Sequence, residues 1–237
     1  MSKPFKFKEF TIAQDRCAMK VGTDGVLLGA WTSLANHPNS ILDIGAGTGL
    51  IALQMAQRSP AETIDAIEVA ADAYEQAVAN FEASPWGDRL FCYHAGLDEF
   101  VDEIEDAYDL IVSNPPFYTE TVSSGNASRD TARQTVALPF DELIAGVAEL
   151  LASDGIFATI IPFKEEEQFI ALAHNSNLCL NKLTRVRGNA TAQIKRSLLQ
   201  FSFQEKPLVE NELVIEIDRH KYTKEYIALT APFYLKM

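Results

Sequence analysis

From Ser40 onward, short apolar runs alternate with segments that have the apolar periodicity of a helix. Residues 41–44 predict a buried strand, and Leu50, Leu53 and Ala56 predict the inner face of a helix behind it. Such repeated alternation implies a mostly parallel sheet with helices on both faces and ligands at the carboxyl ends of its strands. We therefore expect an α/β fold with seven strands. They are 41–44, 63–68, 90–94, 108–113 and 155–162, then a late pair at 178–186 and 198–203.

The segments that flank this alternation are short. Before it, alternating phenylalanines and lysines predict one or two short strands, and residues 26–31 predict a helix. After it, residues 213–217 alternate like a strand, and residues 225–235 predict a terminal helix or packed tail. Neither a linker nor an internal repeat is visible. The prediction is one domain over 1–237, with an N-terminal extension (1–39), a core (40–205) and a C-terminal extension (206–237).

Composition excludes several classes of protein. The chain has 237 residues, and 33 acidic against 20 basic side chains give it a net charge of −13. No apolar run approaches the roughly 20 residues of a membrane span, and residues 1–6 lack the apolar region of a signal peptide. The cysteines and histidines show no metal-binding spacing. These features predict a cytoplasmic protein that uses neither a membrane nor a metal.

A glycine-rich turn follows the first core strand. Asp43 precedes Gly45, Gly47 and Gly49, which lead directly into a helix. Glycines let the backbone turn tightly and approach a ligand closely, and a helix N-terminus favours its electronegative groups. A dinucleotide fingerprint needs a longer glycine spacing than this one. Glu68 ends the next strand, where a carboxylate can accept both hydroxyls of a ribose. The alternative is a structural glycine turn with a chance carboxylate.

The most specific feature is the turn after the fourth strand, which contains Asn114, Pro115, Pro116 and Phe117. The prolines fix φ and lack N–H groups, so the preceding carbonyl is not used in a regular helix. The Asn114 side chain and the Pro115 carbonyl could accept both hydrogens of an exocyclic amine, and Phe117 could stack on a planar base or amide. The alternative is a proline-rich loop that merely leaves the strand.

The two motifs together resemble those of the class I S-adenosylmethionine-dependent amino-methyltransferases. The resemblance implies a Rossmann-like fold, S-adenosylmethionine as cofactor, and a catalytic role for Asn114 and its turn. It implies cofactor contacts for Asp43, the three glycines, Glu68 and Asn114. It also implies cofactor contacts for the pair Thr23 and Asp24, for which a helix cap is the alternative, and for Asp98 near the adenine. Gly96, however, stands where the family usually has the adenine-contacting residue, so Asp98 as a helix cap is an equal alternative.

Three branches of that family use an Asn-Pro-Pro-aromatic turn. They methylate adenine N6, guanine N2 of ribosomal RNA, or glutamine N5 of a protein, and the last two usually carry a large extra N-terminal domain. The opening residues 5–10, the run 20–31 and the tail 226–235 resemble the bacterial tRNA1(Val) adenine-N6 methyltransferases. That resemblance implies methylation of adenine 37 in tRNA, an unpaired base that is cheap to extrude. Two alternatives from other classes of protein are a nicotinamide dehydrogenase and an RNA-binding module without catalytic activity.

Basic residues gather late in an otherwise acidic chain. Residues 182–200 contain five Lys or Arg and no acid. Within them, Lys195 and Arg196 follow a polar loop between the two late strands, which predicts a contact with the phosphates of tRNA. Solvated surface charge is the alternative for any single lysine. We expect a monomer that binds tRNA through this segment, with the N-terminal lysines extending the basic surface.

Overall fold

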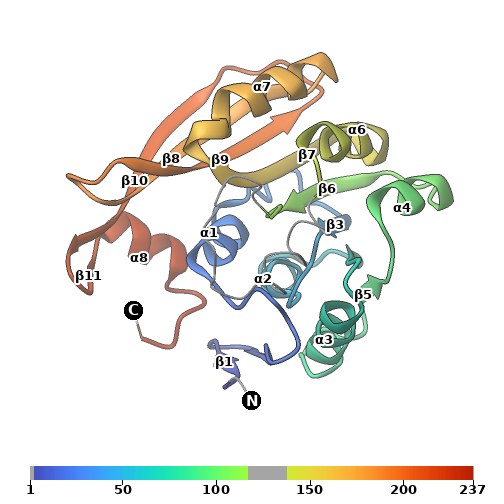
Figure 1. The fold of residues 1–237 in the computed structure, drawn as a ribbon, viewed down its shortest axis with the longest axis horizontal. Helices are drawn as coiled ribbons and strands as arrows, with labels where there is room; N and C mark the ends of the chain where they lie inside the picture. The colour runs from blue at the N-terminus through green and yellow to red at the C-terminus, as the bar shows by residue number, and fades with distance from the viewer. Residues whose placement is uncertain (1–2, 117–137, 237) are drawn as a thin grey trace, which may run out of the picture.

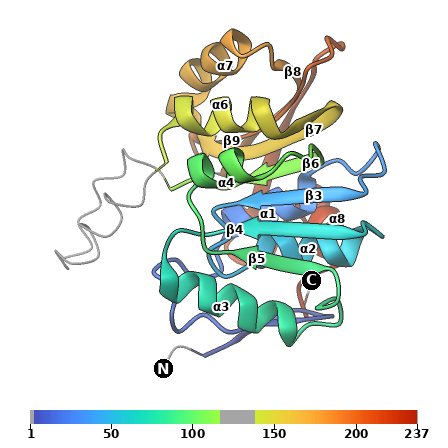
Figure 2. The same cartoon turned by 90° about the vertical axis from the view of Figure 1, so that its right-hand side faces the viewer.

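The structure, a computed structural model, describes residues 3–116 and 138–236. Its centre is a nine-stranded sheet in the order β11-β10-β8-β9-β7-β6-β3-β4-β5 (Figures 1 and 2). The core strands are β3 (Ser40–Ile44), β4 (Thr63–Ile67), β5 (Leu90–Tyr93), β6 (Tyr108–Ser113), β7 (Leu151–Pro162), β8 (Cys179–Asn189) and β9 (Ile194–Ser202). These are the seven strands expected from the sequence. The C-terminal segment adds β10 (Val209–Asp218) and β11 (Lys221–Tyr222) to the same sheet, so the expected count of seven was too low.

The sheet is parallel from β5 to β7 and changes direction at β9. Strands β5, β4, β3, β6 and β7 pair in parallel, whereas β9 runs antiparallel to both β7 and β8. Strand β10 pairs in parallel with β8 and antiparallel with β11. Strand β4 pairs with β3 on one side, and β6 pairs with it on the other. Because all three strands are parallel, their carboxyl ends lie side by side. A crevice for ligands is expected at this reversal of strand order.

Helices cover both faces of the sheet, as predicted (Figure 1). One face is covered by α1 (Thr23–Trp31), α2 (Leu50–Arg58), α3 (Ala71–Glu82) and α8 (Lys224–Thr230). The other is covered by α4 (Leu97–Glu103), α6 (Phe140–Leu150) and α7 (Glu166–Asn175), the last preceded by the 3-10 turn η1 (Phe163–Glu165). Two apolar cores result, one on each side of the sheet. None of the described helices is long and apolar enough to cross a membrane.

The N-terminal segment packs against the C-terminal tail. It forms a small hairpin of β1 (Phe5–Lys6) and β2 (Thr11–Ile12). Phe7 forms an isolated antiparallel bridge with Tyr234, and the centroids of their rings lie 5.9 Å apart. The Lys8 N–H donates to the Phe233 carbonyl at 2.9 Å. Phe7, Phe10 and Ile12 are buried in the same core as α1 and α2, so both chain ends pack onto the core.

Candidate active site

The turn between β3 and α2 leaves room for a ligand above its glycines. Gly45, Gly47 and Gly49 all have positive φ, at 76°, 56° and 77°. A Cβ added at Gly45 or Gly47 would meet no atom within 4 Å, whereas one at Gly49 would lie 2.4 Å from the Phe81 ring. Both the backbone conformation and the packing against Phe81 therefore require glycine at position 49. The first two glycines expose backbone to open space, as a close-fitting ligand site requires.

Two carboxylates flank this turn. Asp43 is fully buried; its Oδ2 accepts the Ala52 N–H at 3.1 Å, and its Oδ1 has no hydrogen-bond partner. Burial raises the pKa of Asp43 to about 7, which a cationic ligand would oppose. Glu68 follows β4 and accepts the Gly47 N–H at 2.8 Å and the Ala70 N–H at 2.9 Å, one on each oxygen. An ionised carboxylate has about four acceptor sites, so Glu68 can still accept hydroxyl hydrogens.

Asn114 lies immediately beyond β6, next to the glycine turn. Ser113 donates its hydroxyl to the Ile44 carbonyl at 3.0 Å, which ties the end of β6 to the end of β3. The Oδ1 atom of Asn114 is buried and has no hydrogen-bond partner among residues 3–116 and 138–236. An unpaired buried acceptor costs about 1–3 kcal/mol, so this atom is placed for a donor that the described residues do not supply. Pro115 is buried and Pro116 half-buried, while the predicted Phe117 lies outside the described residues.

The N-terminus of α1 approaches the same point. A Cβ added to Gly25 would lie 2.9 Å from the Leu50 side chain and 3.9 Å from the Asn114 amide nitrogen. Thr23 and Asp24 are the two residues before Gly25 and begin this helix. Arg196 reaches across from β9, and its Nε donates to Asp24 Oδ2 at 2.8 Å. The structure thus joins a predicted cofactor residue to a predicted RNA residue, a contact that no local pattern in the sequence indicates.

Asp98 occupies the first turn of α4, just after β5, and is exposed. The N-cap of this helix is Gly96, whose N–H donates to the Glu99 side chain at 3.0 Å. Asp98 folds over Gly96 so closely that an added Cβ there would lie 2.5 Å from its Oδ1. Asp98 is therefore not the capping residue of α4. It lies at the same edge of the sheet as Glu68, and its contact with a cofactor stays a prediction.

Asn80 supports the glycine turn, a role that the sequence did not predict. Its Nδ2 donates to the Thr48 carbonyl at 2.8 Å and to the Ala13 carbonyl at 2.9 Å, and its Oδ1 accepts the Ala13 N–H. This buried amide connects α3, the turn and the N-terminal segment. An asparagine in an amphipathic helix carries no signal of such a role, because its partners are far away in the sequence.

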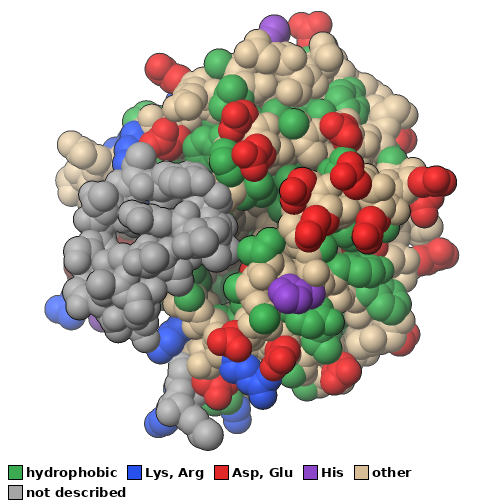
Figure 3. Space-filling model, turned by 45° about the vertical axis from the view of Figure 1, so that its right-hand side comes forward, with side chains coloured by type: hydrophobic (Ala, Val, Ile, Leu, Met, Phe, Trp, Pro, Cys, Tyr) green, Lys and Arg blue, Asp and Glu red, His purple; other side chains and the backbone are tan. Residues whose placement is uncertain are grey.

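The basic run 182–200 is compensated by acids from other elements. The guanidinium of Arg185 binds Glu166 and Glu210, and that of Arg187 binds Glu212 at 2.6 Å. Lys182 lies 4.0 Å from the centre of the Trp31 ring, and burial lowers its pKa. Lys195 is exposed at the start of β9. In Figure 3 acidic side chains are spread over most of the face shown, and some of them lie beside the Lys and Arg side chains at the left and lower left.

Comparison with known proteins identifies the class. The methyltransferase small domain matches residues 25–162, which include the glycine turn and Asn114. A predicted O-methyltransferase from Agrobacterium tumefaciens shares the fold, with a TM-score of 0.69 at 18% identity over 89% of this chain and 96% of that one. The protein is thus a methyltransferase with a Rossmann-like fold, and S-adenosylmethionine is its methyl donor.

Relatives that match this chain over nearly their whole length show its family. A protein of Flavobacterium johnsoniae is 62% identical over 98% of this chain and 100% of its own. One of Phocaeicola vulgatus is 47% identical over 98% of both chains, and one of Pectobacterium carotovorum is 42% identical over 98% and 94%. All three carry the name tRNA1(Val) (adenine(37)-N6)-methyltransferase. The chain belongs to this family.

The residues that follow β3, β4 and β6 fit the cofactor. When bound, S-adenosylmethionine supplies an electrophilic methyl group on a sulfonium cation. Open backbone at Gly45 and Gly47 gives it room, and Glu68 retains acceptor sites for hydroxyl groups. The buried carboxylate of Asp43 favours a cation nearby. Among residues 3–116 and 138–236, no group of His, Cys, Asp and Glu is arranged to hold a metal ion.

Proposed function

We propose that this protein transfers a methyl group from S-adenosylmethionine to N6 of adenine 37 in tRNA1(Val). The observation that supports the chemistry is the unpaired, buried Oδ1 of Asn114 at the end of β6. The family membership over nearly the whole chain supports the substrate. Because tRNA is its substrate, we also expect the protein in the cytoplasm.

Asn114 acts on the amine that receives the methyl group. The lone pair of an adenine amine is delocalised into the ring, which makes it a poor nucleophile. Asn114 Oδ1 and the Pro115 carbonyl accept its two hydrogens and favour the pyramidal nitrogen that attacks. The amine loses a proton readily once it carries the methyl group, so the mechanism needs no general base. Rate enhancement then comes from positioning and fixed dipoles.

The remaining site residues have supporting roles in this proposal. Asp43, the three glycines, Glu68, Thr23, Asp24 and Asp98 contact the cofactor, while Pro116 shapes the catalytic turn and Phe117 stacks on the target base. Lys195 and Arg196 contact tRNA phosphates at the same edge of the sheet. We also expect a monomer, and light scattering of the purified protein tests this.

The nucleoside product distinguishes the proposal from its alternatives. The purified protein is incubated with S-adenosylmethionine and total bacterial RNA and protein, and each fraction is digested and analysed by mass spectrometry. We expect N6-methyladenosine in the tRNA fraction. N2-methylguanosine in ribosomal RNA, or N5-methylglutamine in protein, would assign the enzyme to another branch. RNA binding with no methyl transfer to any fraction would indicate a binding module.

A further inference from the structure

An exposed aromatic ring lies at the carboxyl edge of the sheet, at the end of the strand next to the one that Asn114 follows. Phe163 follows the last residue of β7 and begins η1, and 39% of it is exposed, whereas Ile160 and Ile161 just before it are fully buried. Strands β6 and β7 are parallel, with Ser113 opposite Thr159. Asn114 is one residue beyond that pair and Phe163 four, so they differ by about three residues, or about 10 Å, along the strand direction.

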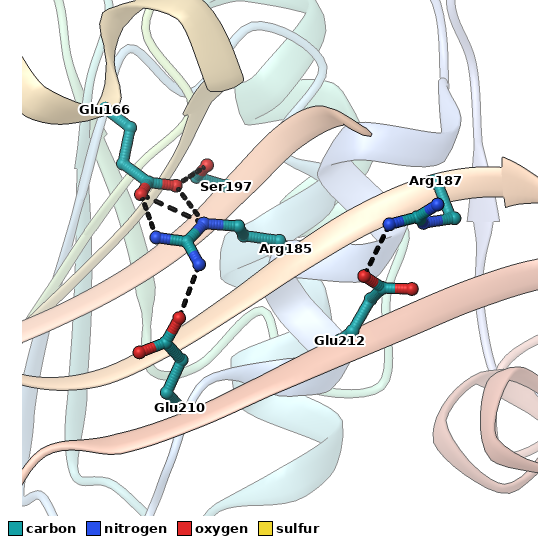
Figure 4. Close-up of polar contacts among 6 residues, drawn as sticks. All are labelled: Glu166, Arg185, Arg187, Ser197, Glu210 and Glu212. Carbon is teal, nitrogen blue, oxygen red and sulfur yellow. Dashed lines mark hydrogen bonds and ion pairs between the residues drawn. The ribbon is translucent and has the colours of Figure 1, made fainter. Parts of the chain in front are cut away.

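A fixed cation supports this ring. The guanidinium of Arg185 lies 5.8 Å from the centroid of Phe163, within the range of a cation–π contact. Glu166, which is 5% exposed, holds Arg185: Arg185 Nε lies 3.0 Å from Oε1 and 3.1 Å from Oε2, and a terminal nitrogen lies 2.6 Å from Oε1 (Figure 4). Ser197 also donates to Glu166, and Glu210 accepts from Arg185.

Single exposed apolar residues are common on protein surfaces, so exposure alone assigns no role to Phe163. Its position at the carboxyl edge of the sheet and its contact with Arg185 are the two further observations that point to a role. Arg185 of β8 is bound by Glu166 of α7 and by Glu210 of β10, and Ser197 of β9 donates to Glu166, so the guanidinium is held from two sides (Figure 4). The Phe163 ring thus lies against a guanidinium that is fixed in place, and it exposes apolar area at the carboxyl edge of the sheet.

We propose that Phe163 is a specificity-determining residue that stacks on an unpaired base next to the target adenine. The inference rests on the proposed function, because the ligand is the loop of an RNA. Loop bases are unstacked and recognised by stacking on aromatic side chains, and every base offers a planar face. The offset from Asn114 assigns to Phe163 a neighbouring base rather than the methylated one.

The test combines protein and RNA variants. Phe163→Ala, Phe163→Tyr and wild type are assayed on a tRNA1(Val) transcript and on two ligated versions, each with an abasic residue on one side of the target adenine. Stacking on one base is worth enough to change affinity about tenfold. We expect Phe163→Ala to raise KM for the intact tRNA by about tenfold, with a much smaller effect on kcat, and Phe163→Tyr to behave like wild type.

The abasic substrates separate stacking from a structural role. On one of them, wild type and Phe163→Ala should have the same KM, because the base that Phe163 contacts is gone. Phe91→Ala is the matched control, since Phe91 is 46% exposed on the edge strand β5; its KM should equal that of wild type. An unchanged KM in Phe163→Ala, or an equal loss on all three substrates, would overturn the inference. Failure of wild type to methylate the intact tRNA would instead contradict the proposed function.

Discussion

At the scale of single residues, the site contains two buried polar atoms that have no hydrogen-bond partner among the described residues. Asp43 Oδ1 and Asn114 Oδ1 are both buried and unpaired at the crevice. A ligand that satisfies such atoms recovers free energy that folding gave up. Their sequence signals differ in strength. The Asn-Pro-Pro turn and the glycine spacing could be recognised directly, whereas the ion pair between Asp24 and Arg196 joins residues 172 positions apart and has no local pattern.

Asn114→Ala tests the catalytic role of that amide. We expect kcat to fall about a hundredfold or more, as for loss of one oriented polar group at a site of developing charge. The affinity for S-adenosylmethionine, measured by calorimetry, should change much less. Asn36→Ala is the control. The Oδ1 atom of Asn36 is also buried and unpaired, but Asn36 precedes β3 and donates to the Asp109 carbonyl, away from the site. Turnover close to wild type in Asn114→Ala would make the turn structural only.

At the scale of elements, strands and helices were predictable because each buries apolar residues with its own period. Strand β7 nevertheless begins at Leu151 rather than Gly155, because Leu151 pairs with Tyr108 of β6. The alternation at 213–217 predicted a strand but not its neighbour, since pairing with β8 depends on tertiary structure. Ion pairs also depend on tertiary structure. The segment 182–200 contains no acid, but its arginines pair with Glu166 of α7 and with Glu210 and Glu212 of β10.

The start of β9 is where we expect contact with RNA. Lys195→Ala/Arg196→Ala should weaken tRNA binding and lower the slope of log K against log salt by roughly one unit for each phosphate that the variant no longer binds. Fluorescence anisotropy across a salt series measures both. Lys206→Ala is the control, because Lys206 follows the other end of β9, at the opposite edge of the sheet. Identical affinity and slope in the double variant and wild type would place the RNA surface elsewhere.

At the scale of the whole molecule, we propose that residues 1–39, 40–205 and 206–237 form one cooperative domain. The N-terminal hairpin, α1 and α8 share one apolar core with α2, and β10 and β11 extend the central sheet. In this arrangement the extensions support the site, because α1 carries Gly25 to Asn114 and the N-terminal segment binds Asn80 near the glycine turn.

Phe7→Ala tests this cooperativity. Phe7 is 4% exposed and packs on Phe10 and Tyr234, so we expect unfolding to cost about 3 kcal/mol less in the variant. Calorimetry should record a single transition that shifts as a whole to lower temperature. A core transition that keeps its midpoint, while a separate small transition moves, would make the N-terminal segment an independent unit.

The central claim is that this chain methylates adenine 37 of tRNA1(Val). The most direct measurement compares methyl transfer from labelled S-adenosylmethionine to two transcripts of that tRNA, one with adenine and one with guanine at position 37, followed by nucleoside analysis. We expect N6-methyladenosine in the adenine transcript and no transfer to the guanine transcript. Equal labelling of both transcripts, or labelling of neither under conditions in which total tRNA is methylated, would contradict it.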